Sequence, residues 1–227
     1  MNMGVKRLVI LVEGDSELKL MNGLVIPELY KRMSCKHCSS EWSLESCKIV
    51  TNRQLNKKGG NINYEYLKND VERFASQGCS VITTFLDFFR LPVTFPGYSA
   101  DGNLIDTIEK AMEKNLRECI VNLPRFIPYI QKFEYEALLF SDLVGFEYLL
   151  DEQEQLDAIK KIIDQYPNPE EINGGSTTAP SKRLLNIFEY NKTSDSYEVL
   201  TMIGFDNIYK KCPRFRGWFD LLEQELD

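Results

Sequence analysis

The stretch "VITTFLDFFRLP", residues 81–92, decides how the rest of the sequence is interpreted. Its residues from Val81 to Leu86 are apolar or β-branched, which is typical of a strand buried on both faces. A single acid, Asp87, follows this run, and two phenylalanines follow the acid. A carboxylate next to buried apolar surface is unfavourable without a compensating partner. The stretch therefore predicts a central strand that ends in a side chain with a ligand or partner.

Segments of the same kind recur on both sides of this strand, which itself is expected over residues 79–87. Residues 6–12, 47–52 and 125–133 also have the composition of strands. The expected helices cover residues 16–33, the stretch that ends near 77, and residues 103–119 and 134–150. Strands that alternate with helices at this spacing indicate an α/β fold with a mainly parallel sheet flanked by helices.

The second half of the chain has a different character from the first. Residues 151–227 are polar and helical in pattern, with a loop over residues 167–183 and an amphipathic closing segment. We therefore expect an α/β core over residues 1–150 and a C-terminal helical extension, residues 151–227, packed on that core. A chain of 227 residues is long enough to bury a sizeable core without disulfide bonds.

Composition and charge restrict the class of protein. The formal net charge is −7, which argues against a broad basic surface that binds nucleic acid by counterion release alone. No segment has the roughly 18 consecutive apolar residues of a membrane span. The apolar run from Leu8 to Val12 is too short for a signal peptide and is typical of a first strand. We therefore expect a cytoplasmic protein with no membrane partner.

Acidic residues stand where the predicted strands end. Ligands of an open parallel sheet bind beyond the carboxyl ends of its strands. Clustered carboxylates raise one another's pKa unless cations hold them, and oxygen ligands of this kind suit Mg²⁺ or Mn²⁺. The sequence thus predicts a Mg²⁺ (or Mn²⁺) site. Its ligands would come from the end of the first strand and the helix after it, from the end of the third strand, and from the start of the helix after the fourth strand. In that order they are Glu13, Glu17, Asp87, Glu134 and Glu136.

Each of these acids also has a simpler interpretation when it is taken alone. Glu13 could cap a turn, and Asp87 could cap a helix or pair with Arg90. Glu134 and Glu136 begin an expected helix, where acids interact favourably with the helix dipole. It is their joint placement at strand ends that favours the metal site.

Four basic residues are candidates for contacts with phosphate. Lys58 precedes two glycines in a turn whose amides could bind an anion. Lys182 and Arg183 follow a proline and a serine at an expected helix start, where free N–H groups attract anions. Arg90 lies near Asp87 in the sequence. An ordinary solvated turn and helix cap would explain the same residues.

The six cysteines do not predict a disulfide framework. Cys35, Cys38 and Cys47, with His37, could offer ligands to zinc. No second Cys-x-x-C is present, however, and His37 lies inside the first cysteine pair. A polar loop with reduced thiols remains the simpler interpretation.

A strand that ends in "VEGDSE" (residues 12–17) and a later strand that ends in an acid resemble the Toprim fold. Topoisomerases, bacterial-type primases and overcoming-lysogenization-defect nucleases share this fold. The resemblance implies that Glu13 acts in acid–base chemistry and that Asp87 binds Mg²⁺.

A closer resemblance is to a family of bacterial Toprim-like proteins of about this size. Its recurring marks correspond here to "VEGDSE", "KKGG", "LDFFRLPVTFPG", "FEYEALLFSD", "APSKRL" and "CPRFRGWFDLLE", which span nearly the whole chain. Two positions depart from the pattern. Phe89 replaces the second aspartate of the Toprim Asp-x-Asp, so that Glu134 or Glu136 must supply the missing carboxylate, and Phe133 stands where the family often has histidine.

Converging carboxylates with Mg²⁺ suit phosphoryl chemistry. Topoisomerases and primases need further domains, so we expect a metal-dependent nuclease that acts on DNA or RNA, with Glu13, Asp87 and Glu136 as catalytic residues. The resemblance to the nuclease relatives implies an ABC-type ATPase as partner in an anti-phage defence system. The sequence leaves open whether the protein forms a homo-oligomer. The alternative is a catalytically degenerate Toprim module that serves as a regulatory or structural subunit of that ATPase.

Overall fold

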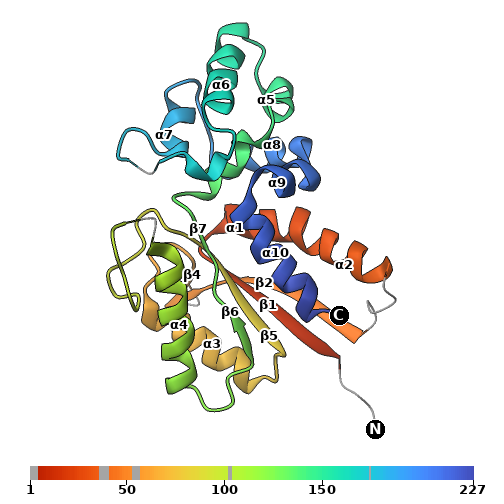
Figure 1. The fold of residues 1–227 in the computed structure, drawn as a ribbon, viewed down its shortest axis with the longest axis vertical. Coiled ribbons are helices and arrows are strands. Elements are labelled where there is room, and N and C mark those ends of the chain that lie inside the picture. The colour runs from red at the N-terminus through yellow and green to blue at the C-terminus, as the bar shows by residue number, and fades with distance from the viewer. Residues whose placement is uncertain (1–4, 36–40, 53–56, 102–103, 174) are drawn as a thin grey trace.

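A parallel sheet forms the centre of the molecule (Figure 1). The computed structural model describes residues 5–35, 41–52, 57–101, 104–173 and 175–227. The strand order is β2-β1-β5-β6, with β7 paired to the end of β5, and all of these pairs are parallel. The strands are β1 (Lys6–Val12), β2 (Trp42–Lys48), β5 (Val81–Asp87), β6 (Arg125–Ile127) and β7 (Ile130–Gln131).

Helices cover both faces of the sheet. Successive side chains of a strand point to opposite faces, so Leu11 and Ile82 pack on one layer of helices while Ile10 and Phe85 pack on the other. The first layer is α3 (Tyr64–Ser76) and α4 (Ile105–Cys119). The second consists of a continuous helical segment and a helix from the end of the chain, namely α1 (Asp15–Leu20), the π-helix η1 (Met21–Val25), α2 (Ile26–Cys35) and α10 (Pro213–Glu225).

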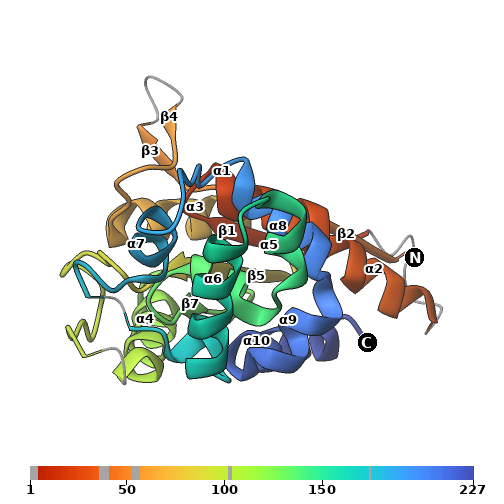
Figure 2. The ribbon, with the colours of Figure 1, turned by 90° about the horizontal axis from the view of Figure 1, so that it is seen from above.

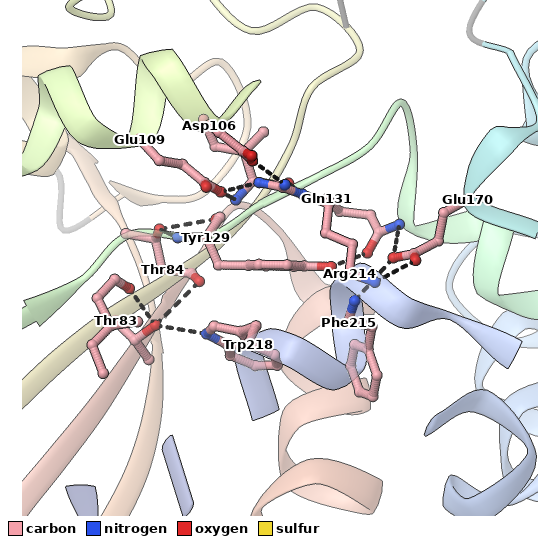
Figure 3. A network of polar contacts seen from close by, with 12 residues as sticks. Thr83, Thr84, Asp106, Glu109, Tyr129, Gln131, Glu170, Arg214, Phe215 and Trp218 are labelled. Carbon is pink, nitrogen blue, oxygen red and sulfur yellow. Dashed lines mark hydrogen bonds and ion pairs between the residues drawn. The ribbon is translucent and has the colours of Figure 1, made fainter. Parts of the chain in front are cut away.

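A polar network anchors α10 to the sheet and to its neighbours (Figure 3). Glu170, in the 3-10 helix η5 (Pro169–Glu171), accepts hydrogen bonds from the backbone N–H groups of Arg214 (2.8 Å) and Phe215 (3.0 Å). The Arg214 guanidinium pairs with two acids of α4. The Trp218 indole N–H donates to Thr83 Oγ1 of β5 at 2.9 Å. The end of the chain is therefore an integral layer of the core.

A helical lobe lies above the carboxyl ends of the strands (Figures 1 and 2). Its elements form one apolar cluster with the sheet, because Phe146, Ile159 and Leu184 belong to the same core as Phe85. The lobe consists of η4 (Tyr135–Ser141), α5 (Val144–Leu149), α6 (Gln153–Gln165), α7 (Pro180–Leu185), α8 (Asp195–Ile203) and α9 (Phe205–Lys211).

The predicted fold class is confirmed: the protein is an α/β protein with a mainly parallel sheet flanked by helices. The helices predicted over 16–33 and 103–119 are present as the α1–η1–α2 segment and α4. The strand predicted over 47–52 is divided between two strands. β2 ends at Lys48, and Val50–Asn52 forms β3, which pairs antiparallel with β4 (Lys57–Lys58). β2 is an edge strand with several half-exposed polar residues, so it lacks the continuous apolar run that marks a central strand.

Two further predicted elements are interrupted. The strand predicted over 125–133 splits into β6 and β7 around Pro128, which has no N–H to donate to the ladder. The helix predicted over 134–150 splits into η4 and α5 because Asp142 is extended, with φ −155° and ψ 150°, and its side chain accepts the N–H of Val144. Among the described residues, every helix falls short of the length and apolar composition that crossing a membrane requires.

Candidate active site

A cleft of about 440 Å³ opens where the carboxyl ends of β1 and β5 meet the helical lobe. We call it the acidic cleft. Parallel strands end at the same edge of a sheet, so acids that are distant in the sequence meet there. All five acids that the sequence predicts as ligands line it, and Asp15 adds a sixth carboxylate. The acidic residues of the cleft are Glu13, Asp15, Glu17, Asp87, Glu134 and Glu136.

Three of these carboxylates surround one ammonium group. Lys192 Nζ lies 3.3 Å from Glu17 Oε1, 3.3 Å from Glu136 Oε1 and 3.6 Å from Asp87 Oδ2. The three acids belong to α1, η4 and β5, so one cation joins three separate segments. Desolvation lowers the pKa of Lys192, but the charges of Asp87, Glu136 and Glu17 outweigh it, and the net pKa is raised. Lys192 therefore remains an ammonium ion.

Asp87, the acid after the buried strand, has two partners. Its Oδ1 accepts the backbone N–H of Tyr135 at 2.8 Å, and its Oδ2 faces Lys192. Burial raises the pKa of Asp87 well above its ordinary value; Lys192 acts against this shift, and neighbouring acids, Glu17 first, add to it. The N–H of Tyr135 fixes the orientation of the carboxylate, so Asp87 presents one oxygen to the cleft.

Glu136 and Glu13 both titrate near neutrality. Glu136 is 1% exposed, and burial raises its pKa to about 7 although Lys192 opposes the shift. Its Oε2 is buried without a hydrogen-bond partner among the described residues. Burial, followed by the charge of Glu17, raises the pKa of Glu13 to about 7. Acid–base catalysis at neutral pH requires groups with such pKa values.

Glu134 is engaged elsewhere in the cleft. Its two oxygens accept the backbone N–H of Ser181 at 2.9 Å and the Ser181 hydroxyl at 3.0 Å. These bonds satisfy the first turn of α7, whose own preceding residue offers no capping side chain. Of the acids predicted as ligands, Glu134 thus uses both oxygens to hold α7 beside the start of η4.

The four basic candidates are distributed unevenly. Arg90 and Lys182 line the acidic cleft. Lys58 is exposed in β4, and of its turn only Gly60 reaches the cleft lining. The Arg183 guanidinium donates to a backbone carbonyl and a tyrosine hydroxyl within the lobe and does not line the cleft. Two of the four are therefore placed to meet a ligand in the cleft.

Sequence reasoning missed Lys192, the residue at the centre of the site. It lies between Tyr190 and α8, in a polar stretch with the composition of a solvated turn. Its backbone carbonyl accepts hydrogen bonds from the hydroxyls of Tyr135 (3.1 Å), Ser16 (3.4 Å) and Ser196. The available signal was indirect, because a positive charge stabilises a cluster of carboxylates.

The cysteine cluster is described only in part. His37, Cys38 and the side chain of Cys35 lie outside the described residues. Cys47 is a free, half-buried thiol in β2, and burial raises its pKa. The zinc interpretation therefore stays untested.

The cleft offers the oxygen ligands that a hard divalent cation prefers. Its groups are carboxylates, and the unpartnered Oε2 of Glu136 can accept a further ligand. As they stand, no three acidic, histidine or cysteine side chains among the described residues form a ready-made metal site. Lys192 holds the oxygens 3.3–3.6 Å away, whereas Mg²⁺ binds oxygen at about 2.1 Å, so these carboxylates would move inward by roughly 1 Å to hold the ion.

Fold and site together define an α/β protein that gathers carboxylates at the carboxyl edge of a parallel sheet. The family model described as "Domain of unknown function (DUF4276)" matches residues 12–223, and the chain belongs to that family. The match includes every residue of the acidic cleft from Glu13 to Lys192. No curated protein and no solved structure matches the chain. The relation to Toprim proteins stays a prediction.

Proposed function

We propose that this protein is a metal-dependent nuclease that hydrolyses phosphodiester bonds of DNA or RNA in the acidic cleft. One observation carries the proposal: Glu17, Asp87 and Glu136, from three separate segments, meet within 3.6 Å of one cationic nitrogen. Positive charge stabilises carboxylates that converge in a buried site. Oxygen ligands from several elements are also how proteins hold Mg²⁺ beside a phosphate.

The residues of the cleft have distinct roles in this proposal. Glu17, Asp87 and Glu136 would hold the divalent ion, and the N–H of Tyr135 orients Asp87. When bound, the ion would supply an activated water and stabilise charge on the phosphate oxygens. Glu13, with a pKa of about 7, accepts a proton from the attacking water near neutral pH.

The substrate is held by few basic residues. Arg90 and Lys182 line the cleft and are placed to contact backbone phosphates. The net charge of −7 weakens any further attraction to nucleic acid. We therefore propose that a protein partner supplies most of the affinity, and the resemblance noted above implies an ABC-type ATPase of an anti-phage defence system.

A second candidate function follows from Lys192. Its ammonium already compensates the three carboxylates, which is what a module without a metal would require. In this alternative the chain is a catalytically degenerate subunit that regulates or supports the ATPase, and the acidic cleft is structural.

Metal-dependent cleavage distinguishes the two functions. Purified protein is incubated with supercoiled plasmid or transfer RNA over a range of Mg²⁺ and Mn²⁺ concentrations, alone and with the partner ATPase. The nuclease proposal expects cleavage that EDTA abolishes. Glu13→Gln and Asp87→Asn are expected to reduce the rate by about 100-fold or more, because they remove the proton acceptor and a metal ligand.

Asp164→Asn is the matched control, because Asp164 is an exposed acid of α6, outside the cleft lining, that pairs with Lys160 in the same helix. It should cleave at the wild-type rate. Absence of cleavage under all conditions, or equal cleavage by wild type and the folded Asp87→Asn variant, would favour the subunit alternative.

A further inference from the structure

The ammonium of Lys192 stands where the charges of three carboxylates converge. Glu17, Asp87 and Glu136 each direct one oxygen to within 3.6 Å of Nζ. The second oxygen of Glu136 is buried and unpartnered in the same cleft. The cluster thus has unused capacity for a ligand, while its central position is already held by a side chain of the protein.

The ammonium and a divalent ion would compete for these oxygens. An ion bonded to any of the three would lie within about 6 Å of the nitrogen, given oxygen–Mg²⁺ distances of about 2.1 Å. Two positive charges at that distance in a partly buried site repel strongly. The ion would also draw the carboxylate oxygens towards itself, so that they would leave their positions 3.3–3.6 Å from Lys192 Nζ.

The Lys192 side chain can rotate out of the cluster of carboxylates while its backbone stays in place. Three hydroxyls, from Ser16, Tyr135 and Ser196, bind the Lys192 carbonyl and hold the backbone in place. The side chain itself is 44% exposed and lies over the Tyr135 ring, with Nζ 4.5 Å from the ring centre. It can therefore swing towards solvent without a change in the fold.

We propose that Lys192 is an internal cation that competes with the divalent ion for the acidic cleft, so that metal binds only when the ammonium withdraws. In metal-free protein, Lys192 holds Glu17, Asp87 and Glu136 together around one positive charge. The inference rests on the proposed metal site, and it makes Lys192 the determinant of the metal concentration at which that site fills.

Direct binding of Mn²⁺ tests the competition without any activity measurement. Electron paramagnetic resonance measures the concentration of free Mn²⁺ as the ion is titrated into wild type, Lys192→Met and Lys182→Met. Lys182 also lines the cleft but has no ion pair with the three carboxylates, so its variant removes the same charge without vacating the central position. We expect Lys192→Met to lower the Kd for Mn²⁺ by roughly tenfold to a hundredfold and Lys182→Met to leave it nearly unchanged.

Chemical labelling of the wild-type protein gives an independent measurement. The rate at which an amine-reactive ester modifies Lys192 is followed by mass spectrometry with and without Mn²⁺, with Lys182 as the internal reference. Withdrawal of the ammonium should raise the relative rate at Lys192 about fivefold or more. An unchanged or slower rate would overturn the proposal.

The outcomes separate this inference from the proposed function. If Lys192→Met binds Mn²⁺ no better than wild type while wild type cleaves nucleic acid, the competition is wrong and the nuclease stands. If Lys192→Met binds Mn²⁺ tightly but no form cleaves, the competition stands and the nuclease is wrong. Equal gains in affinity from Lys192→Met and Lys182→Met would reduce the effect to general electrostatics and overturn the competition.

Discussion

Glu136 is the most enclosed acid of the cleft, 1% exposed and with one oxygen unpartnered. Burial raises its pKa to about 7, whereas the ordinary value is 4.5. The folded state therefore binds the proton more tightly than the unfolded chain. This contribution to stability is fully present below pH 4.5 and is lost as the pH rises through 7. Glu13, with a pKa of about 7, adds to the effect in the same direction.

Replacing Glu136 by glutamine should remove part of this pH dependence. In EDTA, we expect the free energy of unfolding of Glu136→Gln to exceed that of wild type at pH 8 by up to about 3 kcal/mol and to approach it at pH 4.5. Urea denaturation at several pH values measures the difference. Glu65→Gln, an exposed position on α3, is the control. A variant curve parallel to that of wild type would contradict the prediction.

At the residue scale, the sequence predicts the acids better than their partners. Glu13, Asp87 and Glu136 could be predicted because strand ends of a parallel sheet share one edge. Lys192 could not, because its position depends on how α8 packs beside α1 and η4. The bond from Ser181 to Glu134 joins two distant segments in the same way and has no local signal.

At the scale of elements, α10 depends on a side chain from another helix. The residue before α10 offers no side-chain cap, and Glu170 of η5 accepts the first two N–H groups in its place. Glu170 is buried, and these bonds oppose the increase that burial causes in its pKa. The joint between η5 and α10 is therefore sensitive to this one carboxylate.

Glu170→Ala should destabilise the protein by about 1–3 kcal/mol, because it leaves buried N–H groups without an acceptor. Thermal unfolding measures the loss. Glu171→Ala is a neighbouring control whose exposed ion pair with Lys132 is worth at most about 1 kcal/mol. Equal melting temperatures for the two variants would show that the joint contributes nothing.

The elements that sequence patterns predict correctly are those with strong apolar signals. β1, β5 and α4 fall in this class, since each has a buried face that the pattern reveals. The bounds of β2 and the break between η4 and α5 were mispredicted because neither has a strong apolar signal in the sequence. An edge strand tolerates polar residues, and at the break Asp142 is extended and its side chain accepts the N–H of Val144.

At the scale of the molecule, the last helix, α10, completes the core around the central strand β5. Trp218 of α10 packs on Phe85 of β5 with a ring separation of 5.5 Å and stacks on Tyr129 at 4.9 Å. Layers of helix and sheet could be predicted from the alternation of elements. The return of α10 to the sheet was expected only as docking of an amphipathic segment, without a face or a partner.

A fragment that ends at residue 150 should therefore fail to fold cooperatively. It lacks the α10 layer, so one face of the sheet would expose the aromatic side chains that Trp218 and Phe215 cover. Circular dichroism during thermal unfolding, compared with the full chain, measures cooperativity. A sharp melting transition of the fragment would show that residues 1–150 form an independent domain.

The three hydroxyls on the Lys192 carbonyl also have a kinetic consequence. On the exchange proposed above, only the aliphatic stem of the lysine has to rotate, and rotamer changes of exposed side chains take picoseconds to nanoseconds. Mg²⁺ loses its hydration water reluctantly. The rate at which the acidic cleft binds a divalent ion would then be set by the dehydration of that ion. Different divalent ions would bind at rates that follow their own rates of water exchange.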